Sequence, residues 1–209
     1  QEPLRTVAAF TRLLQDRYVG RLDQDADEII GFVADGAQHM QALIAALLSY
    51  FRITNRDIKI ETVDVDVVLE GVVASLHATL TEAGASVTYV RLPKVEADPA
   101  LLADLFTNLI VNAVKYRSDA PPRVQIWGTT AAGFCEFAVS DNGIGIDPRH
   151  HERIFKVFQR LHTRDRYPGT GIGLSICQRI VERLGGRIWL ESAAGKGAVF
   201  HFTLPEGRV

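Results

Sequence analysis

The chain has 209 residues, of which 47% are hydrophobic and 23% charged, a composition typical of a globular protein with room for one large domain or two modest ones. It carries 23 basic and 25 acidic residues, giving a formal net charge of −2. Without a basic block, this charge argues against nucleic acid and anionic membranes as partners.

No apolar stretch reaches the length of a membrane span, and no signal peptide opens the chain. The two cysteines, Cys135 and Cys177, stand far apart in apolar surroundings, which favours small buried side chains in a reducing compartment over a metal or redox site. We therefore expect a cytoplasmic protein with no nucleic-acid partner and no membrane contact by this segment. The abrupt beginning at Gln1 suggests a chain cut from a longer one.

Residues 1–55 have a helical pattern. In the first helix apolar or small residues recur at three- and four-residue steps until a break near Gly20. The second contains a strict heptad, formed by Ile29, Val33, Gly36, Met40, Leu43, Leu47 and Tyr50. A second seam runs beside it through Ile30, Ala37, Ile44 and Phe51.

Two adjacent seams make a stripe too wide for one antiparallel helix to cover. We therefore expect a helical hairpin that dimerises into a four-helix bundle. The alternative is that this apolar face packs against the rest of the same chain.

From Ile53 onward short strands and helices are mixed. Strands are expected at 58–63, 87–90, 94–97, 123–129, 134–140, 187–192 and 198–204, and helices at 67–83, 99–114, 150–158 and 172–184. Asp98 and Pro99 mark the start of one helix, and Gly84 and Gly185-Gly186 mark the ends of two others. Strands and helices do not alternate strictly, so we predict an α+β fold: domain 1–55 is the hairpin, and domain 56–209 is an α/β sandwich with helices on one face of a sheet.

Two glycine clusters bracket a polar stretch: Asp141-Asn142-Gly143-Ile144-Gly145-Ile146 and Gly169-Thr170-Gly171-Ile172-Gly173-Leu174. The second directly precedes a helix, whose N-terminal N–H groups can hold phosphates. It is not a Walker loop, because no Gly-Lys-Ser/Thr follows, and it does not follow a strand as a Rossmann fingerprint does. Either cluster alone is also compatible with ordinary turns.

Asn108, Asn112 and Lys115 share one face of the 99–114 helix and its end, at steps of four and three. Because buried amides are costly without partners, two of them beside a lysine suggest a ligand site. An Asn oxygen can complete Mg²⁺ coordination, and a lysine can neutralise phosphate. The alternative is that these groups only cap neighbouring loops.

Taken in order, Asn108-x-x-x-Asn112-x-x-Lys115-Tyr116, Asp141-x-Gly143-x-Gly145, Phe155-x-x-Phe158 and Gly169-x-Gly171-x-Gly173-Leu174 resemble the N, G1, F and G2 boxes of sensor histidine kinases. This family belongs to the GHKL ATPases, together with gyrase and heat-shock chaperones. The resemblance covers roughly residues 63–204. The first residues, Gln1-Glu2-Pro3-Leu4-Arg5, are similar to the tail of a phytochrome-type H box, which makes the hairpin HisKA-like.

The resemblance implies Mg²⁺ and ATP as cofactors and assigns the following roles. Asn112 would bind the metal, Lys115 the phosphates, and Tyr116 would lie along the nucleotide. Asp141 would accept the adenine amino group, with Gly143, Gly145 and Ile146 close to the base. Gly169, Gly171 and Gly173 would line the phosphates and hinge a lid that runs from about Asp147 to Pro168, with Thr170 and Leu174 in the same nucleotide site. Phe155 and Phe158 would anchor this lid, and Arg160 and Arg164 would reach the γ-phosphate. Thr203 would support the adenine pocket.

Asn108 bears on the reaction type. In hydrolysing relatives a glutamate stands one turn before the metal-binding asparagine, and an amide is no useful general base. The resemblance therefore implies in-line transfer of the γ-phosphate to a protein histidine, with Asn108, Lys115 and Arg160 as catalytic candidates. The phosphate would pass on to an aspartate of a response-regulator receiver domain, under control of an upstream sensor module.

Aligning Pro3 with the proline of the H box places the acceptor histidine three residues before Gln1. None of the six histidines present replaces it, so the chain as printed is expected to bind nucleotide without autophosphorylating. Glu2 departs from the Thr or Asn of many relatives and would repel a phospho-aspartate, which predicts weak phosphatase activity. Two alternatives stay open: a pseudokinase scaffold that binds ATP and a regulator, and an ATP-hydrolysing clamp, which Asn108 and the hairpin disfavour.

Overall fold

The computed structural model describes residues 2–55, 57–159, 161 and 170–207, with only the backbone described for residues 2–4. It divides into two compact units, Gln1–Phe51 and Arg52–Val209. The sequence-based boundary, between residues 55 and 56, falls at the end of a helix that the structure continues to Asn55.

The first unit is a helical hairpin of α1 (Glu2–Tyr18) and the greater part of α2 (Gln24–Asn55). The connection turns at Gly20, which has a φ of 76°. Asp27 Oδ2 accepts the Gly20 N–H at 2.8 Å, and Asp23 Oδ1 accepts the Ala26 N–H at 2.8 Å. Both carboxylates lie at the N-terminus of α2, where they satisfy free N–H groups and favour the helix dipole.

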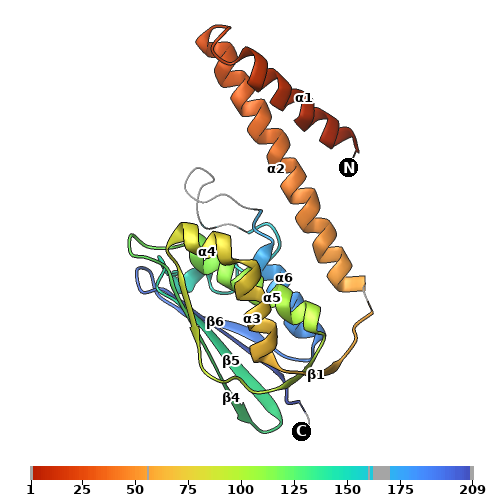
Figure 1. Cartoon of the computed structure of the whole chain (residues 1–209), viewed down its shortest axis with the longest axis vertical. Helices are drawn as coiled ribbons and strands as arrows, with labels where there is room; N and C mark the ends of the chain where they lie inside the picture. Colours follow the sequence, from red (N-terminus) through yellow and green to blue (C-terminus); the bar gives the residue numbers. More distant parts are fainter. Residues whose placement is uncertain (1, 56, 160, 162–169, 208–209) are drawn as a thin grey trace. The chain divides into compact units, whose positions relative to one another are not determined.

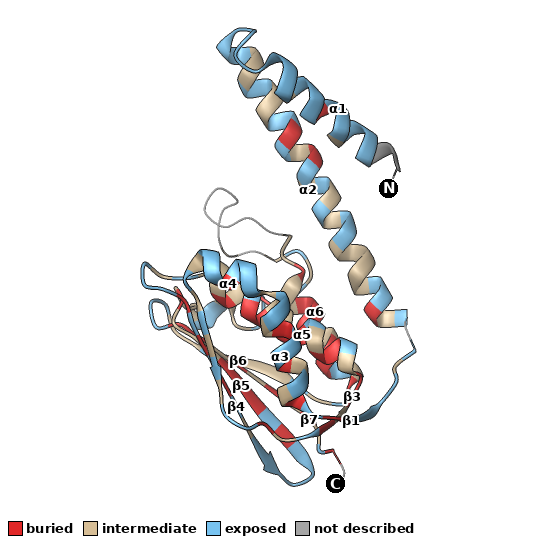
Figure 2. Ribbon diagram, viewed as in Figure 1, coloured by how far each residue is buried: buried red, intermediate tan, exposed pale blue. Residues whose placement is uncertain are grey.

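The hairpin buries little of its apolar surface within one chain (Figure 2). Ala34 and Ala37 are buried between the helices, whereas Phe32 is 75% exposed and Val33 50% exposed. On α1, Phe10 is 63% exposed. Of the two predicted seams, Ile29, Val33, Met40, Ile44 and Phe51 are exposed, whereas Ala37 is buried. None of the helices in the described part of the chain is both long and apolar enough to cross a membrane.

The second unit is built on a five-stranded sheet with the order β2-β4-β5-β7-β6. Its strands are β2 (Ser86–Tyr89), β4 (Arg123–Ala131), β5 (Phe134–Asp141), β6 (Ile188–Ser192) and β7 (Ala198–Pro205). β2 pairs with β4 in parallel and the other pairs are antiparallel. A small sheet joins β1 (Glu61–Val63) to β3 (Val95–Ala97).

The helices α3 (Val65–Ser75), α4 (His77–Ala83), α5 (Pro99–Lys115) and α6 (Gly173–Arg183) lie over one face of this sheet (Figure 1). Between helix α5 and the sheet, Phe106 packs edge-on against Phe137 and Phe202, with ring centroids 6.5 and 5.8 Å away. Phe137 and Phe202 stack on each other at 5.1 Å. All three rings are fully buried. The α+β architecture with helices on one face is confirmed.

The strand expected over 58–63 is confined to Glu61–Val63, and two predicted helices differ in the structure. The helix expected over 67–83 is interrupted at Leu76, whose φ of −91° and ψ of 3° end α3 and begin α4. The helix expected near 150–158 is replaced by a 3₁₀ turn, Pro148–His150, and further turns. The Asp147 side chain accepts the Arg149 N–H at 2.9 Å and so caps this short turn. The turn does not continue as an α-helix.

Candidate nucleotide-binding site

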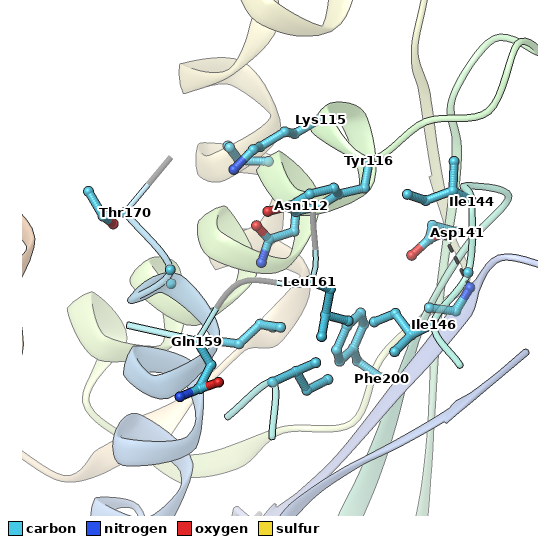
Figure 3. Close-up of a pocket in the computed structure, with 17 residues that line it drawn as sticks. Asn112, Lys115, Tyr116, Asp141, Ile144, Ile146, Gln159, Leu161, Thr170 and Phe200 are labelled. Carbon is cyan, nitrogen blue, oxygen red and sulfur yellow. Dashed lines mark hydrogen bonds between the residues drawn. The ribbon is translucent and has the colours of Figure 1, made fainter. Parts of the chain in front are cut away.

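A cavity of about 340 Å³ opens between the end of α5, the turn after β5 and the start of α6 (Figure 3). This volume suits a small-molecule ligand. Its apolar lining consists of Val111, Ile144, Ile146, Ile154, Leu161, Leu174, Ala198 and Phe200. The polar side chains that line it are those of Asn112, Lys115, Tyr116, Asp141, Gln159 and Thr170.

Helix α5 forms one wall. Asp98 caps its start by accepting the N–H groups of Ala100 and Leu101 at 3.0 and 3.2 Å. The apolar side of the helix is buried against the sheet and α6, which turns the Asn112 and Lys115 side toward the cavity. Lys115 Nζ lies 4.6 Å from the centre of the Tyr116 ring, a cation–π contact that orients the ammonium group.

Asp141, the last residue of β5, stands at one end of the cavity, and Thr170 stands at the other in the view of Figure 3. Asp141 Oδ1 accepts the N–H groups of Gly143 at 2.8 Å and Ala198 at 3.2 Å. Burial raises the pKa of this carboxyl above its ordinary value, and the two backbone hydrogen bonds partly offset that rise. With Oδ1 taken by these donors, Oδ2 is the oxygen left to accept a hydrogen bond from a ligand.

The turn after Asp141 is packed backbone to backbone against the β6–β7 turn, residues 193–197. A Cβ on Gly145 would approach the Ala193 carbonyl oxygen to 2.0 Å, and one on Gly197 would approach the Asp141 carbonyl oxygen to 2.0 Å. Ser192 Oγ joins the same two segments, accepting the Ile146 N–H at 2.8 Å and donating to the Gly197 carbonyl at 2.6 Å. Only glycine permits this approach, which fixes the position of Asp141 and Ile146.

The third wall is the start of α6. No side chain caps its N-terminus in the described part of the chain, so the first N–H groups of the helix are available to an anionic ligand. Gly171, with a φ of 74°, and Gly173 line the cavity here. A Cβ on Gly173 would come within 3.2 Å of Asn108 Oδ1, which shows how closely α6 approaches α5.

The structure brings most of the predicted site residues to this one cavity. Those that line it are Asn112, Lys115, Tyr116, Asp141, Gly145, Ile146, Thr170, Gly171, Gly173 and Leu174. Gly143 lies just behind the lining, where a Cβ would approach the Tyr116 carbonyl oxygen to 2.4 Å. Arg160, Arg164 and Gly169 lie outside the residues that the structure describes.

Besides Gly143 and Phe155, three predicted residues in the described part of the chain do not line the cavity. Asn108 donates its Nδ2 to the Asp104 carbonyl of its own helix at 2.8 Å. Phe158 is 52% exposed, with a φ of 63°. Thr203 lies on the face of β7 opposite to Phe202 and Leu204 and accepts the Arg187 N–H with its Oγ1 at 3.1 Å, so the structure places it away from the cavity.

Several lining residues were not identified from the sequence, although two carried a usable signal. Val111 stands four positions before Lys115 and hence on the same face of α5. Phe200 belongs to the inward set of β7, which alternates buried and half-buried residues. Ile154, Gln159 and Leu161 come from irregular backbone, where no periodicity marks the inward residues.

Comparison with known proteins agrees with the fold. The family model of the histidine kinase-, DNA gyrase B-, and HSP90-like ATPases matches residues 97–208. This match covers α5, the Asp141 turn and α6, and the chain belongs to that ATPase family.

Individual proteins are similar to this chain over nearly all of its length. Cyanobacterial phytochrome A of Nostoc sp. is 45% identical over 99% of this chain and 27% of its own length. The adaptive-response sensory kinase SasA of a Synechococcus strain is 32% identical over 100% of this chain and 57% of its own. Among solved structures, full-length ShkA in complex with AMPPNP has a TM-score of 0.72 and 25% identity, covering 100% of this chain and 44% of that one. The chain thus spans about a quarter to somewhat over half of these relatives.

The backbone contact at Gly197 yields a prediction with a matched control in the same turn. Gly195 and Gly197 have φ values of 77° and 73°, but a Cβ on Gly195 meets open space. Gly195→Ala should cost about 1–2 kcal/mol of unfolding free energy for the left-handed backbone alone. Gly197→Ala should cost about 2–5 kcal/mol, because the clash with Asp141 adds to the same strain. Urea-induced unfolding measures both, and equal losses would contradict the proposed close packing.

Proposed function

We propose that this chain is the catalytic core of a sensor histidine kinase, which binds Mg-ATP and transfers the γ-phosphate to a histidine and then to a response-regulator aspartate. The observation that carries the proposal is the meeting of three separate motifs at one cavity. Asn112 and Lys115, Asp141, and the start of α6 all line it. The kinase name of one relative and the AMPPNP in one similar structure support the same reading.

The adenine base fits the apolar end of the cavity beside Asp141. There the Oδ2 of the carboxylate would accept a hydrogen bond from the exocyclic amino group of adenine. Guanine presents a carbonyl oxygen at that position, which a carboxylate repels. Ile144, Ile146 and Phe200 provide apolar surface for the ring.

The phosphates fit the opposite end, between Lys115 and the uncapped N-terminus of α6. Both supply positive potential without a covalent role, which is what phosphoryl transfer requires of the protein. Mg²⁺, when bound, neutralises charge on the phosphates. Asn112 lines the cavity, and its amide oxygen could hold Mg²⁺ beside the substrate phosphates, through which this ion is commonly bound.

Transfer rather than hydrolysis is favoured by Asn108. Its amide cannot remove a proton from water, and its Nδ2 already donates to the Asp104 carbonyl at 2.8 Å. The acceptor is expected in the H box, three residues upstream of Gln1. A sensor module and a response-regulator receiver domain would complete the pathway in the longer protein.

The decisive experiment uses the natural protein extended upstream through the H box, incubated with ATP labelled at the γ-phosphate. We expect acid-labile, base-stable label on the protein, and its loss in Asn112→Ala. Nucleotide binding without label would favour the pseudokinase scaffold instead. Steady release of free phosphate would favour an ATP-hydrolysing clamp.

Asp141 gives the binding site a defined pH dependence. The ligand requires the carboxylate, and the pKa of this carboxyl is raised by burial. The affinity for ATP should therefore be highest at pH values above the raised pKa. It should fall by up to about tenfold per pH unit as the pH drops through that pKa. For an ordinary aspartate the fall would begin at a lower pH.

The matched variant is Asp141→Asn, whose side-chain oxygen can still accept the backbone N–H groups of Gly143 and Ala198. It should bind ATP about ten- to a hundredfold more weakly, because a hydrogen bond to a charged group is lost, and it should show no decline over the same pH range. Calorimetric titration at several pH values measures both properties. The same pH dependence in this variant would show that another group titrates.

We also propose that the hairpin dimerises through its exposed seams. Val33 and Met40 are 50% and 47% exposed in the single chain, and a second copy would cover them to complete a four-helix bundle. Val33→Glu combined with Met40→Glu should convert a dimer to a monomer, as measured by sedimentation. Ala45→Glu, at an exposed position of α2 outside both seams, should leave the dimer intact. A monomeric wild-type protein would overturn the proposal.

A further inference from the structure

Asn142 connects the turn after β5 to the segment that precedes β4. Its side-chain Oδ1 accepts the Arg123 N–H at 2.7 Å, and its Nδ2 donates to the Pro121 carbonyl at 2.9 Å. Its own carbonyl accepts a hydrogen bond from Ser118 Oγ at 3.1 Å. The three partners all belong to the segment that leads from α5 into β4, residues 116–123, which we term the α5–β4 connection.

The same turn also holds the beginning of this connection. The Ile144 N–H donates to the Tyr116 carbonyl at 3.0 Å, and Gly143 packs so closely that a Cβ would lie 2.4 Å from that carbonyl oxygen. The α5–β4 connection is thereby attached to the Asp141 turn from Tyr116 to Arg123. The Asn142 side chain adds two hydrogen bonds to this attachment, one to the Arg123 N–H and one to the Pro121 carbonyl.

Asn142 itself does not line the cavity, but its neighbours on both sides of the junction do. Asp141 precedes it in the chain, and Lys115 and Tyr116 lead into the connection. An amide presents one acceptor and two donors in one plane, which matches the Arg123 N–H and the Pro121 carbonyl. A carboxylate offers no donor for Pro121, and an aliphatic side chain offers neither.

We propose that Asn142 is a positioning residue that fixes the spacing between the adenine end of the cavity, at Asp141, and its phosphate end, at Lys115. The inference rests on the proposed function and deepens it. Without these two hydrogen bonds, the α5–β4 connection can shift relative to the Asp141 turn. Such a shift should weaken the binding of a ligand that contacts both ends of the cavity. It should hardly change the binding of a ligand that contacts only the adenine end.

The test measures binding of two ligands to the same purified chain, AMPPNP with Mg²⁺ and adenosine, by competition against a fluorescent ATP analogue. Asn142→Ala should weaken AMPPNP binding about tenfold, the size expected from losing two neutral hydrogen bonds, and adenosine binding less than about threefold. Asn142→Asp keeps the acceptor for Arg123 and should give an intermediate loss for AMPPNP. Asp119→Ala, at an exposed position of the same connection, is the control and should change neither affinity.

The outcomes separate this inference from the function on which it rests. Equal weakening of both ligands, or no weakening of either, overturns the positioning role while nucleotide binding by the wild type stands. Failure of the wild type to bind AMPPNP or ATP overturns the proposed function itself. Circular dichroism without ligand identifies a variant that does not fold, and Asn142→Asp then decides the question.

Discussion

One carboxylate oxygen holds together the backbone segments at the end of β5, beside the cavity of the second unit. Asp141 Oδ1 accepts the N–H groups of Gly143 and Ala198, and so joins the end of β5 both to its own following turn and to the start of β7. The neighbouring turn 193–197 can come this close only because Gly145 and Gly197 lack side chains. The two backbone donors partly offset the cost of burying this charged group, and the second oxygen keeps its capacity to accept a hydrogen bond.

The strands and the helices contribute different kinds of groups to the cavity around Asp141. The sheet side and its turn supply apolar surface and one acceptor, through Phe200, Ile144 and Asp141. The helices supply a cation and free N–H groups, through Lys115 and the start of α6. A helix end and a strand end therefore meet across the cavity, with a hydrogen-bond acceptor on one side and positive potential on the other.

The sequence predicted the elements that carry local signals. Asp98-Pro99 identified the start of α5, and Gly84 identified the end of α4. It did not reveal the break at Leu76, because a leucine there continues the helical apolar pattern. At the site, motif spacing predicts Asn112, Lys115 and Asp141, all of which line the cavity. It also predicts Thr203, which the buried alternation of Phe202 and Leu204 places on the other face of β7. Lining residues such as Gln159 depend on irregular backbone, which periodicity does not describe.

The contact between the Asp141 turn and residues 193–197 is made by main-chain atoms, and this bears on how the protein can evolve. Ala194 and Lys196 are exposed, and neither lines the cavity. Substitutions at these two positions are expected to accumulate freely among descendants of this gene. Insertions or deletions in the turn, or loss of Gly197, would move Asp141 and be removed by selection. Variation in this region should therefore change side chains while its length and its glycine stay the same.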